Sequence, residues 1–183
     1  MHQLQFVVDR DVSEREILAL VEPVLARHGL KRQRNSPTVD LHEWEGAGVF
    51  VTIARQSWAG FWWVHIVSHD DSAPGIVDEL RRAELVFDDV GQLRMRARSP
   101  GRRGDALVRL AHAVSLDGDG PFADLVLDVL ERGSDDEVEG AVRAAAHLAW
   151  PIFDVPLERI AGEGGWLGEL ADEALHREHE DDD

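Results

Sequence analysis

The sequence of 183 residues contains no cysteine, no tyrosine and a single lysine, Lys31. Without cysteine there can be no disulfide, no thiolate nucleophile and no cysteine-ligated zinc site. A phosphate-binding loop is also excluded, because its glycine-rich signature needs a lysine that no such segment here provides. No serine stands in a Gly-x-Ser-x-Gly elbow. These absences favour a non-enzymatic protein, with a hydrolase built from scattered Asp, His and Ser residues as the open alternative.

Long apolar runs are missing as well. No window approaches about eighteen uninterrupted apolar residues, which argues against a transmembrane helix and against membrane contact. The N-terminus, Met1–Phe6, lacks the basic start and the apolar stretch of a signal peptide, so we expect a cytoplasmic protein. With 44% hydrophobic and 30% charged residues, the composition is that of a globular chain that can bury a core.

Positive charge is scarce, and its scarcity is uneven. The formal net charge is −17. Residues 1–104 carry 14 Lys and Arg against 15 Asp and Glu, whereas residues 105–183 carry 5 against 21, a net charge of −16. Such a field repels nucleic acid and anionic lipid and attracts basic proteins. We therefore expect a basic protein as the partner and no nucleic acid, with plain solubility as the alternative explanation of the charge.

The first hundred residues show the mixed pattern of an α+β domain. Ser13–Glu16 is a capping box that predicts the start of a helix, which should be kinked or split at Pro23 and end at Gly29. A second helix is expected around Pro74–Ala83. The expected strands are Leu4–Val8, Val39–Trp44, Val49–Ala54, Phe61–Ser68, Leu85–Phe87 and Leu93–Ala97, the last two as a hairpin. Residues 1–100 are thus predicted to form a mostly antiparallel sheet with two helices.

Three arginines alternate with apolar residues in the last of these strands. Arg94, Arg96 and Arg98 are therefore expected on one face of it. A solvated edge that discourages strand pairing, internal pairing with the acidic half and nucleic-acid binding are the three explanations, and the net charge of the following segment argues against the third.

Residues 99–104, Ser-Pro-Gly-Arg-Arg-Gly, mark the expected boundary between two domains. Beyond it the apolar period changes to that of helices, which predicts a helical segment over residues 105–178. The apolar residues that open its successive helices are Leu107, Phe122, Val138, Val155 and Trp166. The segment is short for an autonomous core, so we expect it to pack on the first domain. The acidic tail, residues 179–183, is expected to be disordered.

The helical segment resembles the HEAT family of helical-pair repeats. The residues that carry the resemblance are Leu125–Gly133, Ser134–Glu137 and Val142–Ala149. In that family an acidic turn leads into a helix with a Val-Arg-x-Ala-Ala core. The residues that depart from the family's pattern are Gly140, Pro151 and Pro156. The resemblance implies a surface that holds another macromolecule.

Two features are candidates for binding a partner. Asp135, Asp136, Glu137 and Glu139 cluster at the expected start of one helix. Carboxylates there are favoured by the helix dipole, and they also add to the field that steers a basic protein. Trp58 is expected at a hairpin tip beside a glycine, where a large ring has little to pack on. This position favours a role as an anchor for the partner.

Metal ligands are present in the sequence but not in closed sets. His65 and His69, with Asp70 and Asp71, could hold one ion only if the chain turns sharply after the strand, because residues four apart in a strand lie about 13 Å apart. Asp117–Gly120 resembles the opening of a calcium loop, but the later ligand positions of such a loop are not filled. We expect no metal and no other cofactor.

The sequence favours a non-enzymatic protein-binding module. Small, cysteine-free, strongly acidic proteins of this kind are similar to bacterial immunity proteins, which neutralise basic toxin domains. That similarity rests on size, charge and the β-α-β-β-β start, and it implies an inhibitor that binds a basic partner through its acidic helical half. Two alternatives stay open: a small-molecule or metal-dependent enzyme with a site between the halves, and a regulatory subunit of a larger complex.

Overall fold

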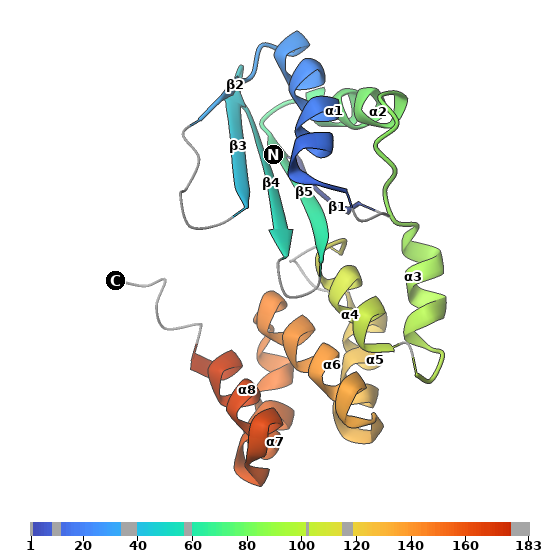
Figure 1. Cartoon of the computed structure of the whole chain (residues 1–183). Coiled ribbons are helices and arrows are strands. Elements are labelled where there is room, and N and C mark those ends of the chain that lie inside the picture. The colour runs from blue at the N-terminus through green and yellow to red at the C-terminus, as the bar shows by residue number, and fades with distance from the viewer. Residues whose placement is uncertain are drawn as a thin grey trace. The chain divides into compact units, whose positions relative to one another are not determined.

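The computed structural model describes residues 2–8, 12–33, 40–56, 60–101, 103–114 and 119–176. The chain divides into two compact units, which we call the sheet unit (Met1–Asp89) and the helical unit (Val90–Asp183) (Figure 1). Each unit has a hydrophobic core of its own. The predicted α+β class is confirmed, with an antiparallel sheet followed by a run of helices. The division falls before the predicted boundary at residues 99–104, which lies inside the helical unit.

The sheet has five antiparallel strands in the order β1-β5-β4-β3-β2. Their bounds are β1 His2–Val7, β2 Lys31–Arg32, β3 Leu41–Gly46, β4 Val49–Gln56 and β5 Phe61–Ser68. The short edge strand β2 was not predicted, whereas β5 has the predicted bounds. The turn between β3 and β4 places Ala47 and Gly48 at φ values of 50° and 77°. Two positive φ values in a two-residue turn match the right-handed twist of the strands that it joins.

Helix α1 (Glu14–Arg27) begins at the predicted capping box. The backbone N–H of Ser13 donates to Glu16 Oε2 at 2.9 Å, and the N–H of Glu16 donates to Ser13 Oγ at 3.3 Å. The helix ends before Gly29, which has a φ of 75°. Of the two predicted effects of Pro23, the split does not occur, since α1 continues through this exposed residue; a kink there stays a prediction.

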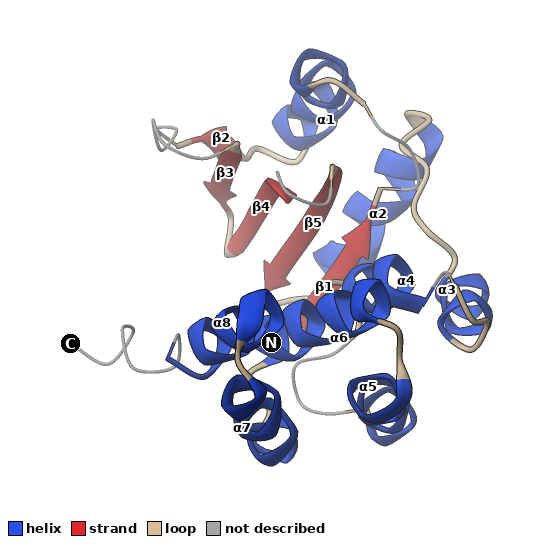
Figure 2. Ribbon diagram, turned by 60° about the horizontal axis from the view of Figure 1, so that its bottom comes forward, coloured by secondary structure: helices blue, strands red, loops and turns tan. Residues whose placement is uncertain are grey.

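Helices α1 and α2 (Ser72–Arg82) pack on one face of the sheet (Figure 2). On that face β5 buries Trp62, Val64 and Ile66 completely. The indole N–H of Trp62 donates to the carbonyl of Val12 at 2.8 Å, so its one polar group is satisfied inside the core. The sheet unit therefore holds its core between this face and the two helices.

The predicted final hairpin is wrong. Residues 93–97 belong to helix α3 (Val90–Ala97), and Phe87 makes only an isolated bridge to Val8. Leu93 and Ala97, four residues apart, are buried, while Met95 between them is 63% exposed. A strand would have put all three on one face, and a helix separates them. The arginines at 94, 96 and 98 accordingly do not line one strand face.

The helical unit is a stack of helical hairpins. Its elements are α3, α4 (Arg103–Ala111), α5 (Gly120–Arg132), α6 (Asp135–Leu148), the 3₁₀ turn η1 (Pro151–Phe153), α7 (Asp154–Glu163) and α8 (Gly165–His176). Helices α4, α6 and α8 lie in one row, and α5 and α7 lie in a second row (Figure 2). The helices predicted after residue 105 are thereby confirmed. That this unit packs on the sheet unit stays a prediction.

Helices α4 and α6 run parallel and touch at a pair of glycines. A Cβ built on Gly140 would lie 2.2 Å from the Cα of Gly104, and one built on Gly104 would lie 2.9 Å from the carbonyl oxygen of Asp136. Neither residue can carry a side chain while the helices stay this close. Gly140, a departure from the HEAT pattern, is thus explained by the contact between the two helices.

Candidate functional site

The predicted acidic cluster does lie at the start of a helix, α6. Asp135 and Asp136 are exposed, and the backbone N–H of Ser134 caps the turn by donating to Glu137 Oε2 at 3.1 Å. Glu139 is half-buried and accepts from Arg143 at 2.8 Å, one turn further along the helix. Carboxylates at a helix N-terminus are stabilised by the helix dipole without any partner. Of the four carboxylates, Asp135 and Asp136 have no partner among the described residues.

Glu137 is a structural residue rather than a surface contact. It is 8% exposed, and its second oxygen, Oε1, accepts the backbone N–H of Gly101 at 2.7 Å. The guanidinium of Arg103 lies 3.6 Å from the same oxygen. The N–H groups of Ser134 and Gly101 lower the pKa of the Glu137 carboxyl, because they donate to its ionised form. This side chain joins the start of α6 to the segment that enters α4.

Replacing Glu137 by alanine is expected to lower the stability of the helical unit by about 1–3 kcal/mol, since it removes a capping box and leaves the Gly101 N–H unpaired. Asp136→Ala is the matched control: the adjacent carboxylate is exposed and should cost less than about 0.5 kcal/mol. Thermal unfolding of both variants measures the difference. Equal melting temperatures for the two would contradict the structural role of Glu137.

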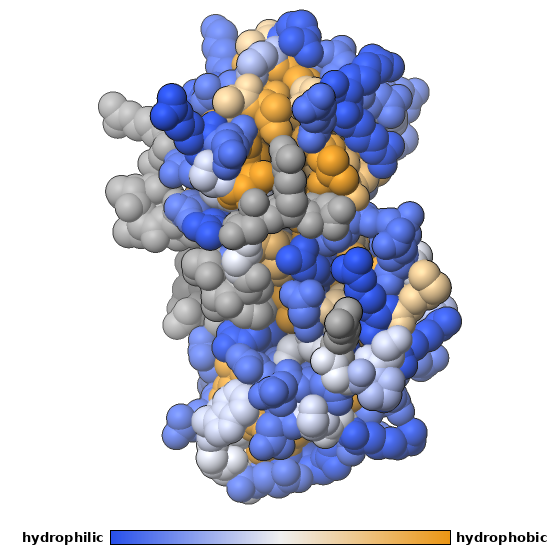
Figure 3. All heavy atoms as spheres, turned by 45° about the vertical axis from the view of Figure 1, so that its right-hand side comes forward, coloured by the Kyte–Doolittle hydropathy of each residue, from blue (hydrophilic) through white to orange (hydrophobic). Residues whose placement is uncertain are grey.

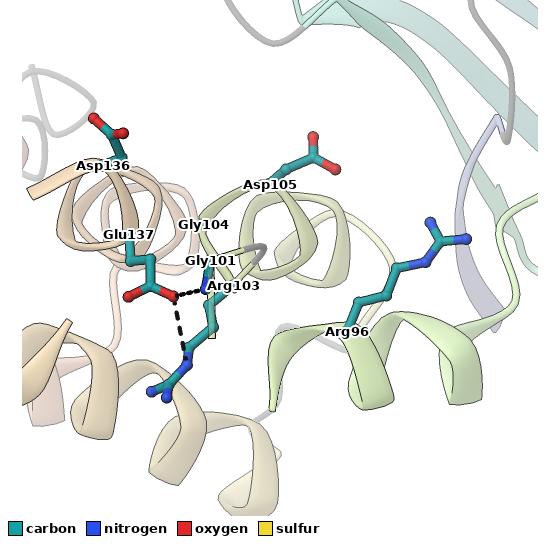
Figure 4. Close-up of a pocket in the computed structure, with 7 residues that line it drawn as sticks. All are labelled: Arg96, Gly101, Arg103, Gly104, Asp105, Asp136 and Glu137. Carbon is teal, nitrogen blue, oxygen red and sulfur yellow. Dashed lines mark hydrogen bonds and ion pairs between the residues drawn. The ribbon is translucent and has the colours of Figure 1, made fainter. Parts of the chain in front are cut away.

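A pocket of about 410 Å³ opens beside this junction (Figure 4). Its lining residues are Arg96, Gly101, Arg103, Gly104, Asp105, Asp136 and Glu137. Glu137 and Arg103 point toward one another, whereas Asp105 and Asp136 point away from them and Arg96 stands apart. The two groups at the centre are therefore occupied by each other. With both signs of charge on its walls, the pocket favours no single class of charged ligand.

Most arginines of the helical unit bind within it. Arg94 pairs with Asp119, the N-cap of α5, and Arg103 pairs with Asp128 at 3.1 Å. Internal pairing was one of the three explanations offered for the alternating arginines, and Arg94 follows it. The other arginines that bind inside the unit are Arg109, Arg132, Arg143 and Arg159.

Seven carboxylates of the helical unit have no hydrogen-bond or ion-pair partner among the residues that the structure describes. They are Asp124, Asp135, Asp136, Asp154, Glu158, Glu163 and Glu169. The face of this unit seen in the lower part of Figure 3 is mostly hydrophilic. The acidic surplus is therefore presented to the surroundings rather than consumed by internal pairs. The net charge alone predicts that carboxylates outnumber arginines in this unit. The ion pairs in the structure then identify which carboxylates are left without a partner among the described residues.

A pair of stacked histidines lies between the C-terminal ends of α4 and α6. The rings of His112 and His147 have centroids 3.7 Å apart and planes 13° apart. Nδ1 of His112 lies 2.9 Å from the carbonyl of Val108, and Nε2 of His147 is a buried atom without a hydrogen-bond partner. Burial lowers the pKa of His112 to about 4 and, together with the charge of His112, that of His147 to about 3. Both rings are neutral near pH 7.

The sheet unit also contains a buried histidine, His42. Arg32 Nη2 lies 2.8 Å from its Nδ1, and because arginine can only donate, Nδ1 accepts and Nε2 carries the proton. Nε2 lies 3.1 Å from Glu14 Oε1 on α1, and Arg32 binds Glu22 on the same helix at 2.6 Å. Burial and the Arg32 charge lower the pKa of His42. This network fastens α1 to β2 and β3.

His65, His69, Asp70 and Asp71, considered above as candidate metal ligands, do not form a metal-binding group in the described part of the chain. The Asp70 carboxylate accepts from the Ser68 hydroxyl at 2.7 Å and from the Ser72 backbone N–H at 2.9 Å. These and the Ser72 side-chain bond lower its pKa to about 2. Among the described residues there is no group of three or more His, Cys, Asp or Glu side chains that could hold a metal ion. Asp70 shapes the turn into α2.

Some predictions fall outside the part of the chain that the structure describes. They concern the anchor Trp58, the first residues of the Asp117–Gly120 turn and the tail at 179–183. None of the helices in the described part is both long and apolar enough to cross a lipid bilayer.

No protein-family model matches this chain, and no curated protein matches it significantly. The resemblance to HEAT repeats and the similarity to immunity proteins therefore stay predictions.

Proposed function

We propose that the protein is a non-enzymatic binding module, an inhibitor of the immunity-protein kind, which holds a basic partner protein in the cytoplasm through its acidic, HEAT-like helical unit. The observation that carries the proposal is the set of seven carboxylates that have no partner among the described residues. Unpaired charges of one sign on a small rigid unit raise the rate at which a partner of opposite sign associates.

The arrangement of the helices adds support. Two rows of helices, stacked hairpin on hairpin, form the scaffold that repeat proteins use to present an extended surface. Buried histidines of both units take part in internal packing: His42 lies between Arg32 and Glu14, and His112 is stacked against His147 in the core. A binding role needs none of them to be reactive.

Affinity capture on the full-length chain, from a lysate of the native host, tests the proposal. We expect a basic protein to be captured and its association rate, measured by surface plasmon resonance, to fall steeply as salt rises, since the Debye length is about 8 Å at physiological ionic strength. Asp135→Lys with Asp136→Lys should slow association severalfold and leave the dissociation rate nearly unchanged.

The matched control is Asp78→Lys with Glu84→Lys, which makes the same change of net charge on exposed residues of the sheet unit. It should slow association less than the helical-unit variant. A salt-insensitive association rate, an acidic partner, or equal slowing by the two variants would refute the electrostatic basis of the proposal.

A further inference from the structure

Exposed apolar side chains in the helical unit are confined to its ends. We call η1, α7 and α8 together the final hairpin. In the described part of the helical unit, large exposed apolar residues occur on α3 and on the final hairpin, and none occurs on α4, α5 or α6. On the final hairpin Ile152 is 54% exposed, Val155 73% and Trp166 51%. No side chain of the described residues covers these three.

Carboxylates without a partner among the described residues lie on the same helices as Val155 and Trp166. Glu158 follows Val155 by three residues on α7, and residues three apart lie on one helix face. Glu163 and Glu169 stand three residues before and after Trp166. These three carboxylates are among the seven without a partner in the described part of the unit. Apolar anchors and free negative charge therefore coincide on the final hairpin.

We infer that this surface, from Ile152 to Glu169, is where a basic amphipathic segment of the partner protein docks. The inference rests on the proposed function and places the contact surface on η1, α7 and α8, while Asp135 and Asp136 at the start of α6 add to the field that steers the partner. Ile152, Val155 and Trp166 are the apolar anchors, and the carboxylates form a rim that receives lysine or arginine side chains.

The negative charge of the final hairpin favours a basic partner segment over a second copy of this chain. A second copy of this chain would bring the same carboxylates against Glu158, Glu163 and Glu169, and like charges face to face disfavour that contact. A basic segment with one apolar face complements both features at once. Helix α7 has ten residues and is about 15 Å long, so a partner helix of about three turns spans the two groups of anchors.

The probe is a labelled helical peptide of lysine and leucine, compared with a lysine–serine peptide of equal charge, each titrated against the full-length protein by fluorescence anisotropy. The lysine–leucine peptide is expected to bind more tightly. Ile152→Ser with Val155→Ser should weaken its binding about tenfold, because apolar anchors at the centre of an interface carry much of its affinity. Met95→Ser, at an equally exposed apolar residue on α3, is the control and should bind as the wild type does.

Each outcome separates this site from the proposed function. If the lysine–leucine peptide binds the wild type and the Ile152/Val155 variant equally, or if Met95→Ser weakens it as much, the docking site is overturned and the proposed function stands. If neither peptide binds the wild type, the docking site is overturned, and the salt dependence of the association rate of the captured partner still tests the proposed function. Salt-dependent dimerisation of the wild type that Ile152→Ser with Val155→Ser abolishes would make a second copy the occupant and overturn the basic segment.

Discussion

Lowering the pH from about 7 to about 4 is expected to destabilise the helical unit by on the order of 5 kcal/mol. The cause is the stacked pair His112 and His147, whose pKa values in the folded protein are about 4 and about 3. In the unfolded chain both rings titrate near pH 6.5. Below that pH the unfolded state binds protons on both rings, whereas the folded state does not until the pH approaches 4. The contribution of the pair to the free energy of unfolding is therefore at its full value above about pH 6.5 and is lost toward pH 4.

His147→Phe should flatten this pH dependence. The variant keeps an aromatic ring against His112 and removes the group with the larger shift. Hydrogen exchange of peptides from α4 and α6, followed by mass spectrometry, measures the local stability. Comparing the two proteins at each pH cancels the intrinsic exchange rate. His176→Gln, at an exposed histidine at the end of α8, is the control and should leave the profile of the wild type unchanged.

A wild-type profile that is flat between pH 6.5 and 4 would contradict the prediction. So would an equal loss of protection in the wild type and in His147→Phe, because the acid sensitivity would then arise from other groups.

The parts of the fold that could be predicted are those whose cause is local. The capping box at Ser13–Glu16 needs only four residues, and both of its hydrogen bonds are formed. Strand β5 is a run of eight residues in which all six apolar side chains are aromatic or β-branched, the types that favour strands. The helices after residue 105 repeat their apolar residues over several turns. In each of these cases a short segment carries enough information to decide its own conformation.

The region around Leu93 shows where local information is insufficient. Five residues that alternate apolar and basic side chains suit a strand, but Leu93 and Ala97 are also four apart, as in a helix. The choice depends on α4, against which α3 packs, and on Asp119, which pairs with Arg94 twenty-five residues away. Tertiary contacts of this kind are invisible in a window of five residues.

The candidate site divides in the same way. The acidic start of α6 could be predicted because its residues are adjacent in the sequence. The sequence could not show that Glu137 accepts a hydrogen bond from the backbone N–H of Gly101, thirty-six residues earlier. Nor could it show that Asp135 and Asp136 have no partner in the described part of the chain. His112 and His147 lie on different helices, and only the parallel packing of α4 and α6 brings their rings together. The exposure of Ile152, Val155 and Trp166 likewise depends on how the helices pack.

Gly140→Ala is expected to destabilise the helical unit by at least about 2 kcal/mol. In an ordinary helix interior the same change is stabilising by about 1 kcal/mol, because alanine has the higher helix propensity. Here the new methyl group would lie 2.2 Å from the Cα of Gly104, so α4 and α6 must move apart. Their separation would loosen the layer that includes Ala141, Ala144 and Ala145, all of which are buried.

The control for this prediction is Gly162→Ala, in α7. A Cβ at Gly162 meets no atom within 4 Å, and its φ is not positive, so the change should be neutral or slightly stabilising. Chemical denaturation followed by circular dichroism compares the two variants with the wild type. The free energy of unfolding is expected to fall for Gly140→Ala and to stay the same or rise slightly for Gly162→Ala, although the substitution is the same. If both variants were stabilised alike, the close contact between α4 and α6 would be wrong, and with it the stacking of His112 on His147 that depends on the same parallel pair.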